Sequence, residues 1–120
     1  MRSNWLEHQG RKILYQDFSK QFYNSAAVKE ELDQVQKIVI AEPLNSVRVL
    51  SDFRDTNVGS DLLTAMNNAS AATKAHVLKT AVLGVTGMKR KLADLLTALT
   101  GQPLKYFDDI ESAKNWLAED

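Results

Sequence analysis

The alternation of short strand patterns with helical patterns is the feature that most limits how this chain can fold. Two neighbouring strand runs and a helix pattern come first, and strand and helix patterns then follow one another three more times. Successive parallel strands need a crossover connection, usually a helix, and such crossovers are right-handed in nearly all known folds. We therefore predict an α/β fold with a mostly parallel sheet.

The first two strand runs are close enough in the sequence to form a β-hairpin. Residues 4–8 and 11–18 each alternate in hydrophobicity, and Gln9 and Gly10 separate them. A two-residue connection that contains glycine is typical of hairpin turns, because glycine adopts positive φ without steric cost. The sheet should therefore open with an N-terminal antiparallel hairpin.

Apolar residues at helical spacing, together with capping residues, place the helices. The first helix should begin at Asn24 or Ser25, and Ser60 should be the N-cap of the second. A third should follow Gly87, and a fourth should begin in the acidic segment 108–111, which has the pattern of a capping box. Between these helices we expect strands at 46–52, 79–85 and 104–107.

Length and composition narrow the class of protein. A chain of 120 residues is long enough to bury one core, and we expect a single domain over residues 1–120. Its 15 basic and 15 acidic side chains give a net charge of zero, which argues against a general nucleic-acid binder. The absence of cysteine excludes a disulfide framework and a thiolate metal site. No apolar run approaches the ~18 residues that span a membrane, and we expect a cytoplasmic protein.

Charged residues in the strand runs predict that the two sheet faces are buried unequally. Strands covered on both faces should be almost continuously apolar. Basic residues instead recur at alternate strand positions, which we assign to one face of the sheet: Lys12, Arg48, Lys79 and Lys105. Ile13 then lies on the opposite face. We expect helices mainly on one face, and a partly apolar, basic face open either to solvent or to a partner.

Four segments together resemble a known family. They read Gly-Arg-Lys-Ile-Leu-Tyr-Gln-Asp-Phe, Val-Arg-Val-Leu-Ser-Asp, Ala-Val-Leu-Gly-Val-Thr-Gly-Met-Lys and Tyr-Phe-Asp-Asp-Ile-Glu-Ser-Ala-Lys-Asn-Trp-Leu. In these segments the chain resembles the SpoIIAA-like proteins, a STAS-related bacterial group. The resemblance implies about four strand-helix turns with helices mainly on one face. The wider group includes anti-sigma-factor antagonists and regulatory domains of transporters, and the fold is similar to that of lipid-carrying domains.

The resemblance also directs attention to Ser60. Antagonists of the STAS type carry an Asp-Ser-x-Gly-like motif at the start of the second helix, and a partner kinase phosphorylates its serine. Here residues 56–62 read Thr-Asn-Val-Gly-Ser-Asp-Leu, so the motif is missing. Ser60 lies at roughly the corresponding place, and we interpret it as a helix cap rather than a phosphorylation switch.

Two polar segments at the ends of predicted strands are candidate ligand sites. Gly84, Thr86, Gly87 and Lys89 lie where a strand leads into a helix, and free N–H groups at a helix start attract anions. The glycine spacing is not that of a Walker A loop. The alternative is a tight turn that Thr86 caps, with the basic side chains in solvent.

Asp52 and Arg54 follow another predicted strand. Ligands of parallel sheets gather at the carboxyl ends of strands, so these residues should share a crevice with Gly84. The alternative is an ordinary salt-bridged loop. His8 and His76, the two histidines, have no partner at ligand spacing, so we expect no metal site, no catalytic group and no cofactor.

Two functions from different classes remain open. The first is a non-enzymatic regulatory or interaction module that binds a protein partner or a second copy of itself. The second is a carrier or sensor of a small acidic or lipid-like ligand, held in an apolar crevice between helices and sheet with its acidic head at the helix start near Gly87.

Overall fold

The N-terminal hairpin forms as its sequence predicts. The computed structural model describes residues 1–85 and 103–119, and it places β1 at Asn4–His8 and β2 at Arg11–Asp17. Gln9 and Gly10 connect these strands with φ values of 51° and 77°. Two consecutive positive φ values are the signature of the two-residue hairpin turn that matches the twist of the strands.

The parallel strands follow in chain order. β3 (Val47–Asp52), β4 (Val77–Leu83) and β5 (Leu104–Phe107) extend the sheet in the order β1-β2-β3-β4-β5. Only the β1–β2 pair is antiparallel within this sheet. The predicted mostly parallel sheet with an antiparallel opening is confirmed, whereas the helix predicted after Gly87 lies outside the described residues.

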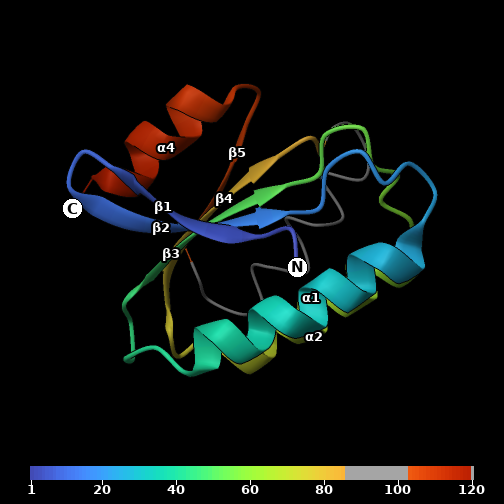
Figure 1. The fold of residues 1–120 in the computed structure, drawn as a ribbon, viewed down its shortest axis with the longest axis horizontal. Helices are drawn as coiled ribbons and strands as arrows, with labels where there is room; N and C mark the ends of the chain where they lie inside the picture. The colour runs from blue at the N-terminus through green and yellow to red at the C-terminus, as the bar shows by residue number, and fades with distance from the viewer. Residues whose placement is uncertain (86–102, 120) are drawn as a thin grey trace.

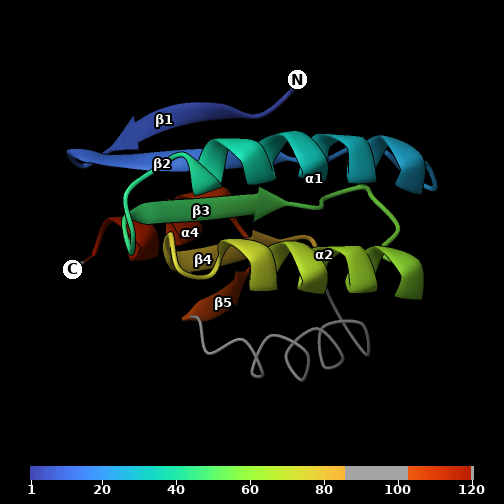
Figure 2. The same ribbon diagram turned by 90° about the horizontal axis from the view of Figure 1, so that it is seen from below.

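Helices lie on both sides of this sheet. α1 (Ser25–Ile40) and α2 (Ser60–Thr73) lie side by side on one face, and α4 (Ile110–Ala118) lies on the other (Figures 1 and 2). α1 connects β2 to β3 and α2 connects β3 to β4, so two right-handed crossovers in the same direction put both helices on one face. α4 follows the last strand, which leaves it free to pack on the opposite face.

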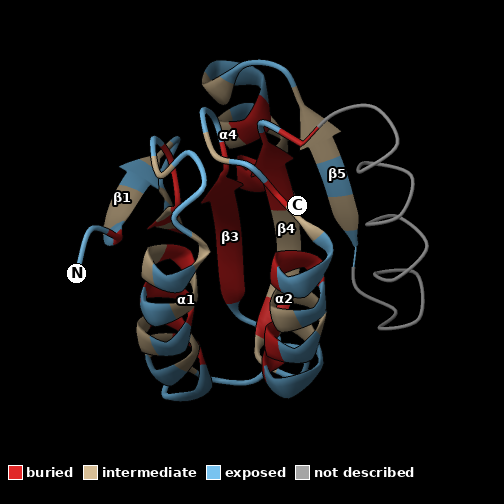
Figure 3. Cartoon of the chain, turned by 90° about the vertical axis from the view of Figure 1, so that its right-hand side faces the viewer, coloured by how far each residue is buried: buried red, intermediate tan, exposed pale blue. Residues whose placement is uncertain are grey.

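The described helices thus lie mainly on one face, but the prediction that the other face is open is wrong. Ala113 and Leu117 of α4 pack against Ile13, Leu50 and Leu83, which come from three different strands. All residues of β3 are buried, as Figure 3 shows. This strand is therefore covered by a helical layer on each side, as in other α/β proteins.

The C-terminus of α4 accommodates two of the basic side chains that led to that prediction. Arg48 Nη1 donates a hydrogen bond to the carbonyl oxygen of Leu117 at 3.2 Å, and Lys79 Nζ donates one to the carbonyl oxygen of Trp116. The last carbonyl groups of a helix lack partners within the helix and attract cations. The Lys79 ammonium also lies 4.5 Å from the centre of the Trp116 ring.

The predicted orientation of β2 is also wrong. Ile13 pairs with Arg48 across β2 and β3, so the two side chains share the face that α4 covers. Lys12 therefore points to the other face, where its Nζ lies 4.1 Å from the ring centre of Trp5. Lys105 is exposed at the sheet edge. Alternation within a strand does not fix the register against its neighbour, and a shift by one residue reverses every side chain.

The larger core lies between the sheet and the pair α1 and α2. Val28 and Val35 of α1 and Leu62 of α2 pack there with Phe18 and Phe53, whose rings stack at 4.9 Å between centroids. The predicted capping of α1 is confirmed, because the Asn24 side chain accepts a hydrogen bond from the amide of Ala27. This core supports the ends of β2 and β3 from one side.

Candidate functional site

Loops meet where β2 and β3 end, at the carboxyl edge of the parallel strands. Backbone amides of Phe18, Lys20 and Phe22 donate to carbonyl oxygens of residues 52–55 over 2.9–3.0 Å. In return, the amide of Asn57 donates to the carbonyl oxygen of Phe22 at 2.6 Å. The two loops therefore continue the hydrogen bonding of the sheet beyond the strands, and we call residues 18–24 and 53–57 the carboxyl-edge loops.

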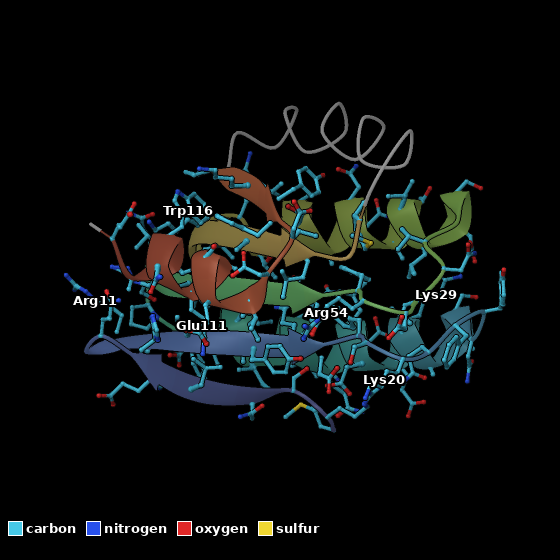
Figure 4. All side chains as sticks on the ribbon, turned by 90° about the horizontal axis from the view of Figure 1, so that it is seen from above. Arg11, Lys20, Lys29, Arg54, Glu111 and Trp116 are labelled. Atoms are coloured by element: carbon cyan, nitrogen blue, oxygen red, sulfur yellow. The ribbon has the colours of Figure 1, made fainter. Side chains whose placement is uncertain are left out.

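The side chain of Asp52, at the end of β3, ties this edge together. It is fully buried, and its Oδ2 accepts hydrogen bonds from the Tyr15 hydroxyl (2.6 Å) and from Arg54 Nη2 (2.8 Å). Its Oδ1 accepts from the Nε and the backbone amide of Arg54, both at 3.0 Å. The Arg54 side chain stays 47% exposed, so it links a buried carboxylate to the surface (Figure 4).

The pKa shifts in this cluster keep each group in one charge state. Burial raises the pKa of Asp52, but the hydrogen bonds from Arg54 and Tyr15 outweigh it and bring the pKa below its usual value. Burial, and then the hydrogen bond to Asp52, raise the pKa of the Tyr15 hydroxyl. A general acid or base works best with a pKa near the operating pH. The shifts favour the charged carboxylate of Asp52 and the neutral hydroxyl of Tyr15, which are the states that their hydrogen bonds with Arg54 and with each other require.

Gly84 lies directly against the loop that follows β3. Its φ is +85°, and a Cβ at this position would lie 2.5 Å from the Arg54 amide nitrogen and from the carbonyl carbon of Phe53. The structure thus brings Gly84 close to the Asp52–Arg54 pair, as the sequence predicts. Thr86, Gly87 and Lys89 lie outside the described residues, so the anion site at that helix start stays a prediction.

The predicted role of Ser60 as N-cap of α2 is wrong. The N-cap is Gly59, which offers no side-chain hydrogen bond, and Ser60 is the first helical residue. Glycine and serine are both accepted at N-caps, so the sequence did not distinguish the neighbours. Ser60 is exposed. The missing phosphorylation motif remains the reason not to assign it a switch.

Sequence reasoning missed two exposed aromatic residues at the carboxyl edge. Phe22 and Tyr23 are 63% and 85% exposed. Phe22 also has a φ of +53°, and Lys20 one of +57°, left-handed values that cost a non-glycine residue ~1–2 kcal/mol. A signal was present in the sequence: two adjacent aromatic residues stand between the end of β2 and the Asn24 cap, where neither a strand nor a helix pattern gives them a core position.

A cavity of about 90 Å³ lies elsewhere, between α1, α2 and the sheet. Its described wall is mostly apolar, with Val35 of α1 and Val82 of β4 as examples. Asp52, Arg54 and Gly84 are not among the described residues that line it. Phe53, whose carbonyl carbon lies beside Gly84, does line the cavity. A crevice shared with the helix start near Gly87 stays a prediction, because that helix start lies outside the described residues.

Both histidines hydrogen-bond to neutral oxygen atoms, and His8 shares its partner with Gln9 Nε2. His8 Nε2 lies 2.7 Å from Asn115 Oδ1, and His76 Nδ1 lies 2.8 Å from the carbonyl oxygen of Glu42. Within residues 1–85 and 103–119, no group of three or more histidine and acidic side chains is arranged to hold a metal ion. In the same residues, no helix has the length and apolar character needed to cross a membrane.

Comparison with known proteins covers most of the chain. The model of the family described as SpoIIAA-like matches residues 16–118, from the end of β2 to the end of α4. No curated protein and no solved structure matches the chain. The matched part contains both carboxyl-edge loops and the Asp52–Arg54 pair. The chain therefore belongs to the SpoIIAA-like family.

Proposed function

We propose that this chain is a regulatory module that binds a protein partner and has no catalytic chemistry of its own. Membership of the SpoIIAA-like family supports a regulatory or interaction role. The observation that carries the proposal is the pair of exposed aromatic side chains, Phe22 and Tyr23, at the carboxyl edge. Aromatic residues that fill pockets of a partner are among the strongest contributors to protein–protein affinity.

The backbone that carries these aromatic residues is already ordered. The amide and the carbonyl group of Phe22 are both hydrogen-bonded to residues 55–57, and the Gln21 amide donates to the Thr56 hydroxyl at 3.1 Å. Binding through an ordered loop avoids much of the entropy cost of fixing a flexible one. The neighbouring residues Lys20, Gln21 and Asn24 are polar, as in the rim of an interface, and Lys20 lies toward one end of the molecule (Figure 4).

Site-specific photo-crosslinking in the native host tests the proposal. A photoreactive phenylalanine at Tyr23 should give a discrete protein adduct, and Phe22→Ser in the same chain should weaken that adduct several-fold. The matched control is the same photoreactive residue at Leu44, which is 70% exposed in the connection between α1 and β3, and it should give no such adduct. Phe22→Ser should leave the melting temperature unchanged within a few degrees, because the Phe22 side chain lies mostly in solvent.

Equal adducts from positions 23 and 44, or none from either, would contradict the proposal. Sedimentation with lipid vesicles that depends on Phe22 and Tyr23 would also contradict it, because the loop would then bind a membrane surface. An adduct with a second copy of the chain would identify the partner as the chain itself.

A further inference from the structure

The strand β1 forms an open edge of the sheet. It is the first strand in the order β1-β2-β3-β4-β5, and β2 is the one described strand that pairs with it. Figure 2 shows no other described element beyond it. An edge strand of this kind presents backbone N–H and C=O groups with which a second strand can pair.

The register of the hairpin determines which backbone groups of β1 point outward. His8 and Arg11 close the two-residue turn, and such a closing pair exchanges hydrogen bonds. Bonded and non-bonded pairs alternate along an antiparallel ladder, so Trp5 and Glu7 direct their N–H and C=O groups away from β2. The Asn4 side chain donates to the Trp5 carbonyl oxygen at 3.3 Å, but a carbonyl oxygen can accept two hydrogen bonds.

These outward groups fit a second copy of the same strand. When two copies run antiparallel around a two-fold axis at Leu6, Trp5 of each copy lies opposite Glu7 of the other, and all the outward groups are paired. An axis at Trp5 would instead place Glu7 opposite Ser3. The Ser3 amide is already engaged, since it donates to Glu31 Oε2 at 2.8 Å. An axis at Glu7 would place two carboxylates directly opposite each other, which is unfavourable.

The side chains of this register also complement each other in charge. Lys12 Nζ lies 4.1 Å from the centre of the Trp5 ring, so a positive charge lies above this ring. Glu7 of the second copy lies opposite Trp5 in the paired strands, which brings its carboxylate beside that ammonium group. A charged side chain usually protects an edge strand from pairing. Here the exposed charge of Glu7 favours one register instead.

From these observations we propose that two copies of the chain associate through β1 and join their sheets into one. Leu6 of each copy then meets Leu6 of the other at the axis, on the face that α4 covers. A single pair of short strands buries little surface, so this dimer dissociates in the micromolar range. The interface does not involve Phe22 or Tyr23, so its failure would leave the proposed function standing.

Engineered cysteines test the register directly, because the chain contains no cysteine of its own. The two Cα atoms at position 6 lie about 4.5 Å apart in this pairing, a separation that a disulfide bridges. Leu6→Cys should therefore give a disulfide-linked dimer under mild oxidation. The matched control is Asn4→Cys, which is more exposed in the single chain but lies opposite His8 of the second copy. If Asn4→Cys links as fast as Leu6→Cys, the links arise from random collision and the proposal is wrong.

Sedimentation velocity tests the charges without the cysteine variants. The unaltered chain should form a reversible dimer at roughly 100 µM. Glu7→Lys should weaken association roughly tenfold or more, because it faces Lys12 of the second copy, and adding Lys12→Glu should restore it. Glu30→Lys, the same change on an exposed position of α1, should have no effect.

Three results would each overturn the proposal. The first is a monomer of the unaltered chain at this concentration. The second is association of the Glu7→Lys variant as tight as that of the unaltered chain. The third is a double variant that associates no more tightly than Glu7→Lys alone.

Discussion

Gly84→Ala should destabilise the domain much more than Gly10→Ala, although both glycines have positive φ. The two φ values are +85° and +77°, so an alanine at either position bears a similar left-handed cost of ~1–2 kcal/mol. Their surroundings differ. A Cβ at Gly10 would have no atom within 4 Å, whereas at Gly84 it would lie 2.5 Å from the Arg54 amide nitrogen and 2.8 Å from the Arg54 Cα.

The extra cost at Gly84 follows from the kind of atom that the methyl group meets. Both contacts are with backbone atoms, which cannot rotate away as a side chain does, so the end of β4 or the 53–57 loop has to move. Forcing extra volume into a packed site costs ~1–3 kcal/mol. Together with the left-handed cost we expect a loss of ~2–5 kcal/mol for Gly84→Ala, against ~1–2 kcal/mol for Gly10→Ala.

Urea unfolding of both variants, followed by far-ultraviolet circular dichroism, measures this difference. The two variants should show similar slopes and different midpoints, because only the stability of the folded state changes. If the variants lose the same free energy within ~0.5 kcal/mol, the close approach of Gly84 to the Arg54 backbone does not constrain the fold. The contact between the end of β4 and the loop that carries Arg54 would then lack experimental support.

Three further perturbations probe the polar contacts. Asp52→Asn should lower the free energy of unfolding by ~1–3 kcal/mol at pH 7. Because the folded-state pKa of Asp52 is lowered, the stability that the carboxylate contributes is lost as the pH falls below about 4. Urea unfolding should therefore show a smaller difference in stability between the variant and the unaltered chain at pH 3 than at pH 7. Lys79→Met should cost ~1–2 kcal/mol by removing the cation at the end of α4, and hydrogen exchange should show α4 opening before the rest. Asn24→Ala should lower the unfolding free energy by ~1 kcal/mol, whereas Ser60→Ala should change it by less than ~0.5 kcal/mol, as measured by thermal unfolding.

The elements of this fold could be predicted because their signals are local. Gln9-Gly10 identifies the hairpin turn, Asn24 identifies the start of α1, and the β-branched run ending at Asp52 identifies β3. The order of these elements then determines the parallel sheet through the handedness of crossovers. Of the candidate site, the meeting of Gly84 with the Asp52 loop followed from the same rule, since neighbouring parallel strands end at the same edge.

The errors arose where the outcome depends on contacts between distant segments. Arg48 and Lys79 look like surface residues in the sequence, yet they pair with carbonyl oxygens of Trp116 and Leu117 at the other end of the chain. The exposed position of Phe22 depends in the same way on hydrogen bonds to residues 55–57. Local periodicity contains no information about such pairings, so these positions could not be derived from it.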